Sequence, residues 1–158
     1  MNKRELFLQQ LRLGDLWADH VAAEIRTLGK EAVASPHQVA TTQAERDMFT
    51  EFDKDIKLSR DRVLEVKSRS LYFTEDPATF PYDTAFIDTV EGWHAKDVAP
   101  IAVAIVSQKT GAIVIAPVSK QPEWKQSRVH DRLRGFDINV YECPRIFLKT
   151  FREFVAWL

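Results

Sequence analysis

The stretch "DIKLSRDRVLEVKSRS", residues 55–70, decides the fold because it predicts a hairpin in the middle of the chain. Two strand candidates, at about 52–58 and 62–73, are joined by the polar turn "SRDR". A second pair of strands is indicated by "PIAVAIVSQ" and "GAIVIAPVS", which are dense in Val and Ile and are connected by "QKTG". We therefore expect a sheet built mainly from antiparallel strands.

The second strand of the first hairpin has two different faces. Side chains alternate along a strand, so Leu64 and Val66 point to one side, whereas Glu65 and Lys67 point to the other. The side of Leu64 and Val66 is expected to be buried. A carboxylate and an ammonium among apolar residues are costly to bury unless they are paired or have a chemical task.

The rest of the chain adds helices around this sheet. Residues 3–28 are expected to be helical, in two pieces joined near Gly14. The spacing of Phe86, Val90 and Trp93 predicts a helix over "TAFIDTVEGWHAKD". The other expected elements are an imperfect strand in "EAVASPHQVA", a short helix at 124–134, a strand at "DINVYEC" and a terminal helix over "PRIFLKTFREFVAWL". Together they predict one domain, residues 1–158, with an α/β sandwich around a mixed sheet flanked by helices.

Composition excludes several classes of protein. The chain has 158 residues, 45% of them hydrophobic, which suits one domain with a substantial core. Its net charge of −1 argues against a generic polyanion binder, so contact with nucleic acid would need a local basic surface. Cys143 is the one cysteine, which excludes an internal disulfide and a cysteine-rich zinc site. Because no apolar run has membrane length and the first residues lack a signal-peptide core, we expect a soluble, cytoplasmic protein.

Asp55 and Glu65 are the first candidates for a metal site. A hairpin can bring them within a few ångströms, close enough to share one divalent cation, and Mg²⁺ favours such oxygen-rich sites. Lys67 could then orient or deprotonate the attacking water and offset charge in the transition state. Asp53, on the same strand face as Asp55, is an alternative ligand. An ion-pair ladder on an exposed strand would use the same residue types, so the spacing alone leaves both interpretations open.

The N-terminal helix adds further acids. It carries Asp19, His20 and Glu24, and Gly29 ends it just before the first strand. With this helix, the chain resembles the PD-(D/E)XK nuclease superfamily, whose core is helix–strand–strand–strand–helix–strand. Holliday-junction resolvases and small phage nucleases of that kind are similar in size. As an order of elements, the resemblance covers about residues 14–118.

The resemblance implies a restriction-endonuclease-like core and a particular catalytic set. In that family, an acid from the first helix, an Asp on the second strand and an (E/D)-x-K motif on the third converge on one or two Mg²⁺ ions. These positions look like Asp19, Asp55 and Glu65-Val66-Lys67. The alternative to the helix acid is Glu24.

The match in residue identity is confined to about residues 55–67, and Lys54 stands where the family often has proline. The resemblance implies a Mg²⁺-dependent nuclease that hydrolyses phosphodiester bonds in DNA, with Mn²⁺ able to substitute. At this size we expect it to select DNA structure rather than sequence, or to act within a larger assembly. A homodimer would explain the cutting of two strands, and the aromatic terminal helix could supply its interface. The alternative is a non-catalytic nucleic-acid-binding or scaffold protein that retains the nuclease-like core.

A local basic surface is predicted in residues 107–134, where six cations stand against two acids for a net charge of +4, with Trp124 among them. At the end of the middle helix, His94 and Lys96 could approach the site or a phosphate. The residues expected to contact nucleic acid are Lys96, Lys109, Lys120, Lys125, Arg128 and Arg132.

Overall fold

A computed structural model describes residues 2–35, 56–132 and 134–158, which form two sheets and the helices around them. The larger sheet has six strands in the order β1-β2-β3-β5-β6-β9, and the smaller has three in the order β4-β8-β7. The larger sheet contains β1 (Ala32–Ala34), β2 (Ile56–Leu58), β3 (Val63–Arg69), β5 (Ala102–Ser107), β6 (Ile113–Pro117) and β9 (Lys149–Thr150). The smaller contains β4 (Thr84–Thr89), β7 (Lys125–Asp131) and β8 (Phe136–Pro144), and the helices are α1 (Lys3–Thr27), α3 (Val90–His94) and α4 (Phe151–Trp157).

The larger sheet is mixed, as the sequence predicts. Strands β1, β2 and β3 form an antiparallel meander, and β3 then pairs in parallel with β5. Strands β5 and β6 form the second predicted hairpin. The α/β class and the mixed sheet flanked by helices are therefore confirmed. The first parts of the strand predicted at about 52–58 and the last parts of "EAVASPHQVA" lie outside the described residues.

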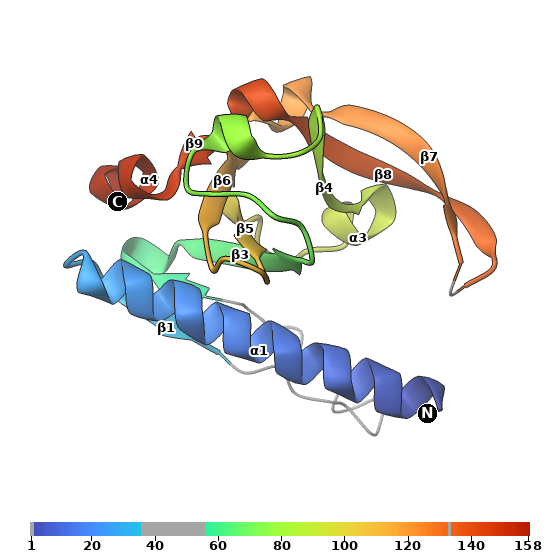
Figure 1. Ribbon diagram of the computed structural model, residues 1–158, viewed down its shortest axis with the longest axis horizontal. Helices are drawn as coiled ribbons and strands as arrows, with labels where there is room; N and C mark the ends of the chain where they lie inside the picture. Colours follow the sequence, from blue (N-terminus) through green and yellow to red (C-terminus); the bar gives the residue numbers. More distant parts are fainter. Residues whose placement is uncertain (1, 36–55, 133) are drawn as a thin grey trace.

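The two faces of the larger sheet pack against different layers (Figure 1). On one face, Leu64 of β3 shares a core cluster with Ile25 of α1. On the other face, Ile105 of β5 shares a second cluster with Ile87 of β4 and Trp93 of α3. The central strands are therefore covered on both sides, by α1 on one side and by the smaller sheet with α3 on the other.

Helix α1 runs without a break from Lys3 to Thr27, so the predicted interruption near Gly14 is wrong. Asn2 and Glu5 form a capping box that satisfies backbone donors at its first turn. A glycine inside a helix costs only about 1 kcal/mol relative to alanine. That cost is too small to break a helix whose C-terminal half is docked on a sheet.

No helix among the described residues has the length and apolar character needed to cross a membrane.

The helix predicted over "TAFIDTVEGWHAKD" is wrong for its first half. Residues 84–89 form β4, and only Val90–His94 form a helix, α3. Ala85 and Ile87 are buried at every second position, and β4 pairs with β8, a partner far away in the sequence. Thr89 then caps α3 by accepting a hydrogen bond from the Gly92 amide. The long-range pairing overrides the local helical spacing.

The short helix predicted at 124–134 is also wrong. This segment forms the edge strand β7, which pairs with β8 from Lys125 opposite Glu142 to Asp131 opposite Phe136. None of the residues in β7 is fully buried. The strand has Val129 as its one apolar residue and therefore lacks the apolar alternation by which a half-buried strand is recognised.

The terminal helix is shorter than predicted. It begins at Phe151 rather than at Pro144, because Arg145–Phe147 form a 3-10 turn and β9 pairs with β6. The hydroxyl of Thr150 accepts a hydrogen bond from the Glu153 amide and so caps α4.

Candidate active site

Strand β3 places Glu65 and Lys67 on the face turned toward β4 and α3, opposite to the face of Leu64. Glu65 is only 7% exposed. It therefore does not belong to a ladder of ion pairs on an exposed strand. Its ion pairs are enclosed between the two layers of the protein.

Two lysines share one oxygen of Glu65. The Nζ atoms of Lys67 and Lys96 each lie 3.0 Å from Oε1. The other oxygen, Oε2, is buried and has no hydrogen-bond partner among the residues that the structure describes. A buried carboxylate oxygen without a donor is costly. Oε2 is therefore an unsatisfied acceptor inside the protein.

Lys96 joins the site to the second sheet. It follows α3, and its Nζ lies 3.5 Å from Oδ2 of Asp88 on β4 and 5.8 Å from the centre of the Trp93 ring. Burial disfavours the ammonium, but Coulombic attraction and hydrogen bonds from Glu65 and Asp88 outweigh it and raise the pKa of Lys96. Lys96 thus stays charged at neutral pH. His94 instead lies 2.8 Å from the Tyr141 hydroxyl through Nε2.

Arg69, two residues after Lys67, adds a third positive charge. Burial lowers the pKa of its guanidinium, while Asp88 and Glu65 act in the opposite direction. It donates hydrogen bonds to the carbonyls of Ser68 and Phe86. Three cations and two carboxylates give the cluster a net charge of +1, so its electrostatics favour an incoming anion.

The predicted ligand Asp55 and its alternative Asp53 lie outside the described residues. The residue that follows Asp55 is Ile56, which pairs with Leu64, the neighbour of Glu65. The described end of β2 therefore lies beside the part of β3 that carries the candidate site.

The predicted helix acids lie elsewhere. Asp19 and its alternative Glu24 are exposed on α1, and α1 packs against the sheet face opposite to Glu65. No three His, Cys, Asp or Glu side chains within residues 2–35, 56–132 and 134–158 form a group that could hold a metal ion. The described part of the structure thus does not bring Asp19 together with Glu65 and Asp88.

Glu65 nevertheless fits one role in a Mg²⁺ site. Mg²⁺ is commonly held by one or two carboxylates together with waters and phosphate oxygens. Glu65, whose Oε2 has no partner among the described residues, would supply one such carboxylate, and Asp88 is a second carboxylate beside the same lysine. In a nuclease, the substrate phosphate and water would complete the coordination.

The residues predicted to contact nucleic acid do not form one surface. Lys109 lies in the turn between β5 and β6, whereas Lys120 follows the far end of β6. Lys120 pairs with Glu123 at 3.4 Å. Lys125 begins β7, and Arg132 directly follows it.

The ribbon formed by β7 and β8 extends away from the larger sheet (Figure 1). On it, Arg128 and His130 both contact the carboxylate of Asp137, at 3.4 Å and 2.9 Å. These hydrogen bonds, first that of His130 and then that of Arg128, lower the pKa of Asp137. Trp124 does not belong to an exposed stacking surface, because it is 6% exposed and packs edge-on against Trp93.

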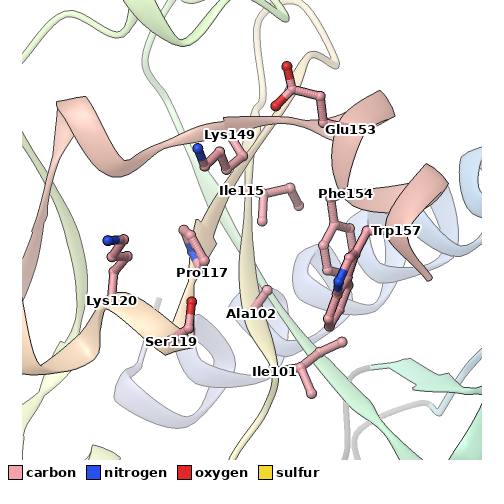
Figure 2. Close-up of a pocket in the computed structure, with 10 residues that line it drawn as sticks. All are labelled: Ile101, Ala102, Ile115, Pro117, Ser119, Lys120, Lys149, Glu153, Phe154 and Trp157. Atoms are coloured by element: carbon pink, nitrogen blue, oxygen red, sulfur yellow. The ribbon is translucent and has the colours of Figure 1, made fainter.

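A pocket of about 330 Å³ lies on the other side of the sheet, between β5, β6 and α4 (Figure 2). Ala102 and Ile115 line it and belong to the same core cluster as α1. Trp157, which is 66% exposed, forms part of its wall. The pocket is therefore separate from the face that carries Glu65.

Sequence reasoning missed Asp88 as a member of the cluster, whereas Arg69 follows Lys67 on the same face of the strand that carries the candidate site. The helix predicted over "TAFIDTVEGWHAKD" contains Asp88 and gives it no place beside Glu65. Reading "TAFIDT" as an alternating strand, with Ala85 and Ile87 inward, would have put Asp88 near the end of a strand and next to the segment that carries Lys96.

Comparisons with protein-family models, curated proteins and solved structures give no match for this chain. The assignment of a function therefore depends on the geometry of the site.

Proposed function

We propose that the protein is a Mg²⁺-dependent nuclease that hydrolyses phosphodiester bonds in DNA. The observation that carries this proposal is the buried Glu65, with one oxygen paired to lysines and the other without a hydrogen-bond partner among the described residues. An acid and a lysine held together on one strand face can serve both charge stabilisation and proton transfer at a phosphate.

The order of elements supports a restriction-endonuclease-like core. Helix α1 precedes the β1–β2–β3 meander, and β3 pairs in parallel with β5. The resemblance to the PD-(D/E)XK nucleases implies the order helix–strand–strand–strand–helix–strand with Glu65 and Lys67 on the third strand, and this chain differs in having β4 between β3 and α3. The segment between β3 and β5 adds Asp88 and Lys96 to the site.

In this proposal each side chain has a role. Glu65 would hold Mg²⁺, with Asp55 as its predicted partner ligand, whereas Asp19 lies on the opposite side of the sheet and takes no part. Bound Mg²⁺ would polarise the phosphodiester and lower the pKa of a coordinated water. The ammonium of Lys67 lies 3.0 Å from Oε1 of Glu65. In this proposal Lys67 orients the attacking water and offsets the charge that develops on the phosphate.

The charge distribution supports a phosphate-bearing substrate. The cluster around Glu65 carries a net charge of +1, although the whole chain carries −1. The β7–β8 ribbon carries further exposed cations, among them Lys125 and Arg132. A two-stranded ribbon is narrow enough to enter the DNA major groove, so it suits contacts to the backbone of a DNA structure.

The test is cleavage of labelled linear, flapped, single-stranded and four-way-junction DNA in Mg²⁺ or Mn²⁺. A Glu65→Ala, Lys67→Ala variant is compared with a Lys57→Ala, Glu75→Ala control, whose side chains are exposed. Folding of both variants is checked by circular dichroism. We expect metal-dependent cleavage by wild type and control and its loss in the site variant. Cleavage that survives in the folded site variant would exclude this site.

The net positive cluster also favours a second candidate, a phosphate-binding module without catalysis. Two lysines already neutralise Glu65, so a phosphate could bind without a metal ion. This alternative predicts DNA binding that is equal with Mg²⁺ and with a chelator, and no cleavage of any substrate in either metal.

A further inference from the structure

The pocket between β5, β6 and α4 has one face of the larger sheet as its floor. Strand pairing places Ala102 of β5 opposite Pro117 of β6, and Ile115 of β6 opposite Lys149 of β9. Phe154 of α4 lines the pocket and belongs to the same core cluster as Ala102 and Ile115. Strand pairing and core packing therefore fix the shape of the floor.

Trp157 forms one wall of the pocket and is held in place. It lies three residues after Phe154, on the same side of α4, and the centres of the two rings are 6.3 Å apart. The guanidinium of Arg62 lies 5.7 Å from the centre of the indole, and Arg62 also donates a hydrogen bond to the carbonyl of Leu158. The indole is nevertheless 66% exposed. A large aromatic side chain that is already fixed can bury apolar area against a ligand with little loss of conformational entropy.

Positive charge lies at the other end of the pocket. Figure 2 shows Lys120 and Lys149 across the pocket from Trp157. The Nζ atom of Lys120 lies 3.4 Å from Oε2 of Glu123 and 5.2 Å from the centre of the Phe147 ring, so its charge is already in use. Lys149 is exposed and forms no ion pair with any residue that the structure describes. Its ammonium is therefore available to an incoming anion.

The remaining polar groups of the lining agree with an anion at this end. The carboxylate of Glu153 is exposed, and Figure 2 shows it directed away from the cavity. Ser119, next to Lys120 in the chain, is exposed, and its hydroxyl has no hydrogen-bond partner within the described part of the structure. A hydroxyl can donate to a carboxylate oxygen. The pocket thus has an aromatic wall at one end and an ammonium with a hydroxyl at the other.

We propose that this pocket binds a small aromatic carboxylic acid, with its ring against Trp157 and Phe154 and its carboxylate at Lys149. Pockets for small molecules commonly measure about 300–1,000 Å³, so a pocket of about 330 Å³ suits a ligand of one or two rings. The single unpaired ammonium matches one negative charge, which favours a carboxylate over a dianionic phosphate ester.

This binding site is independent of the proposed nuclease. The floor of the pocket belongs to the sheet face that packs on α1, whereas Glu65 lies on the face turned toward β4 and α3. The outcome for the ligand therefore decides nothing about DNA cleavage, and the absence of cleavage would leave the pocket unaffected.

The test is titration with naphthalene-1-acetate and with its uncharged amide, naphthalene-1-acetamide, by calorimetry and by NMR of the ligand. The two site variants are Trp157→Ala and Lys149→Gln. Their controls are Tyr72→Ala, at a position that is also 66% exposed, and Lys57→Gln, whose side chain is exposed on β2. Circular dichroism checks that all four variants fold.

We expect wild type to bind the acetate about fivefold more tightly than the amide, because only the acetate pairs with Lys149. Trp157→Ala should weaken both ligands by at least about fivefold, since it removes the aromatic wall. Lys149→Gln should lower the affinity for the acetate to that for the amide and leave the amide unchanged. Both controls should bind like wild type.

Failure of wild type to bind the acetate would overturn the proposal. Equal binding of acetate and amide would do the same, as would unchanged affinity in the folded Trp157→Ala protein. Sedimentation that shows a wild-type dimer and a monomeric Trp157→Ala protein would assign the pocket to an interface between copies and thereby refute the ligand. If Trp157→Ala does not fold, Lys149→Gln against Lys57→Gln decides.

Discussion

Replacement of Glu65 by glutamine removes the charge on which both lysines depend and hardly changes the volume of the side chain. The amide oxygen can still accept a hydrogen bond, but the amide nitrogen is a donor and faces an ammonium in one of its two orientations. Lys67 and Lys96 then remain close to each other and to Arg69. Asp88 is the one counter-charge left in this cluster. We expect the folded state to lose stability for this reason.

The magnitude follows from the distances and the exposure. Two unit charges 3.0 Å apart attract each other by roughly 5 kcal/mol at an effective dielectric constant of about 20. The lysine side chains are 29% and 25% exposed, so they regain part of their hydration when Glu65 is lost. Breaking a fully buried pair costs about 3–5 kcal/mol and an exposed pair about 0–1 kcal/mol. The expected loss for Glu65→Gln lies between these limits, at about 2 kcal/mol.

The assay is urea unfolding followed by circular dichroism at neutral pH. The raised pKa of Lys96 means that its stabilising charge is fully present below its ordinary pKa and is lost only as the pH rises through the shifted value. The same measurement on Lys96→Met and on the double variant gives the coupling energy. A Glu65→Gln protein within about 0.5 kcal/mol of wild type, or a coupling energy near zero, would refute the buried ion-pair geometry.

Three further outcomes are expected. Ile105→Ala should lower the free energy of unfolding by about 2–5 kcal/mol, because Ile105 is 1% exposed. The control Ile146→Ala, at a position that is 83% exposed, should change it by less than about 0.5 kcal/mol. Urea unfolding measures both variants, and equal effects would contradict the assignment of Ile105 to the core. Burial raises the pKa of the Cys143 thiol to about 12 in the folded protein. As the pH rises, the thiol therefore loses its proton in the unfolded chain before it does so in the folded protein. The free energy of unfolding should consequently fall between about pH 8.5 and 12, by up to roughly 1.4 kcal/mol per pH unit. Unfolding measured across this range should therefore show a smaller fall in Cys143→Ala, and identical pH profiles would exclude the buried thiol. The triple variant Glu65→Leu, Lys67→Met, Lys96→Met should lose less stability than Glu65→Gln, because no buried charge is left unpaired. It should also fail to bind Mn²⁺, and binding that is retained in calorimetry would exclude Glu65 as a ligand.

The sequence predicted the central sheet because its strands carry their own signals. The β5 and β6 segments consist of Val, Ile and Ala except for their last residues, Ser107 and Pro117, and all residues of β5 are buried. The alternation in "LEVK" likewise predicted which side of β3 faces the core shared with α1. These features depend on neighbouring residues, so a single sequence is enough to recognise them.

The smaller sheet could not be predicted in the same way. Strand β4 contains a bulge between Phe86 and Asp88 and gains its strand conformation from β8, more than fifty positions later in the chain. The edge strand β7 has no fully buried residue. Both strands are defined by pairing partners rather than by their own periodicity, and local spacing therefore suggested helices.

The candidate site was only half predictable for the same reason. Glu65 and Lys67 share one strand, so their proximity follows from a period of two. Asp88 and Lys96 reach the site because the smaller sheet and α3 cover that face of β3, which depends on the packing of two layers. Long-range packing thus supplied the residues that local patterns missed.

The burial of Glu65 bears on why this residue is present at all. Apolar residues of similar volume often replace a buried ion pair with no loss of stability, so stability alone gives weak support for keeping a carboxylate at this position. The cluster is also not arranged for the strongest pairing, because both lysines use Oε1 while Oε2 stays unpartnered among the described residues. A purely structural ion pair would be expected to satisfy both oxygens. An unsatisfied carboxylate oxygen, enclosed with three cations between two sheets, is better explained by a ligand that completes the site, and this favours a binding or catalytic role for Glu65.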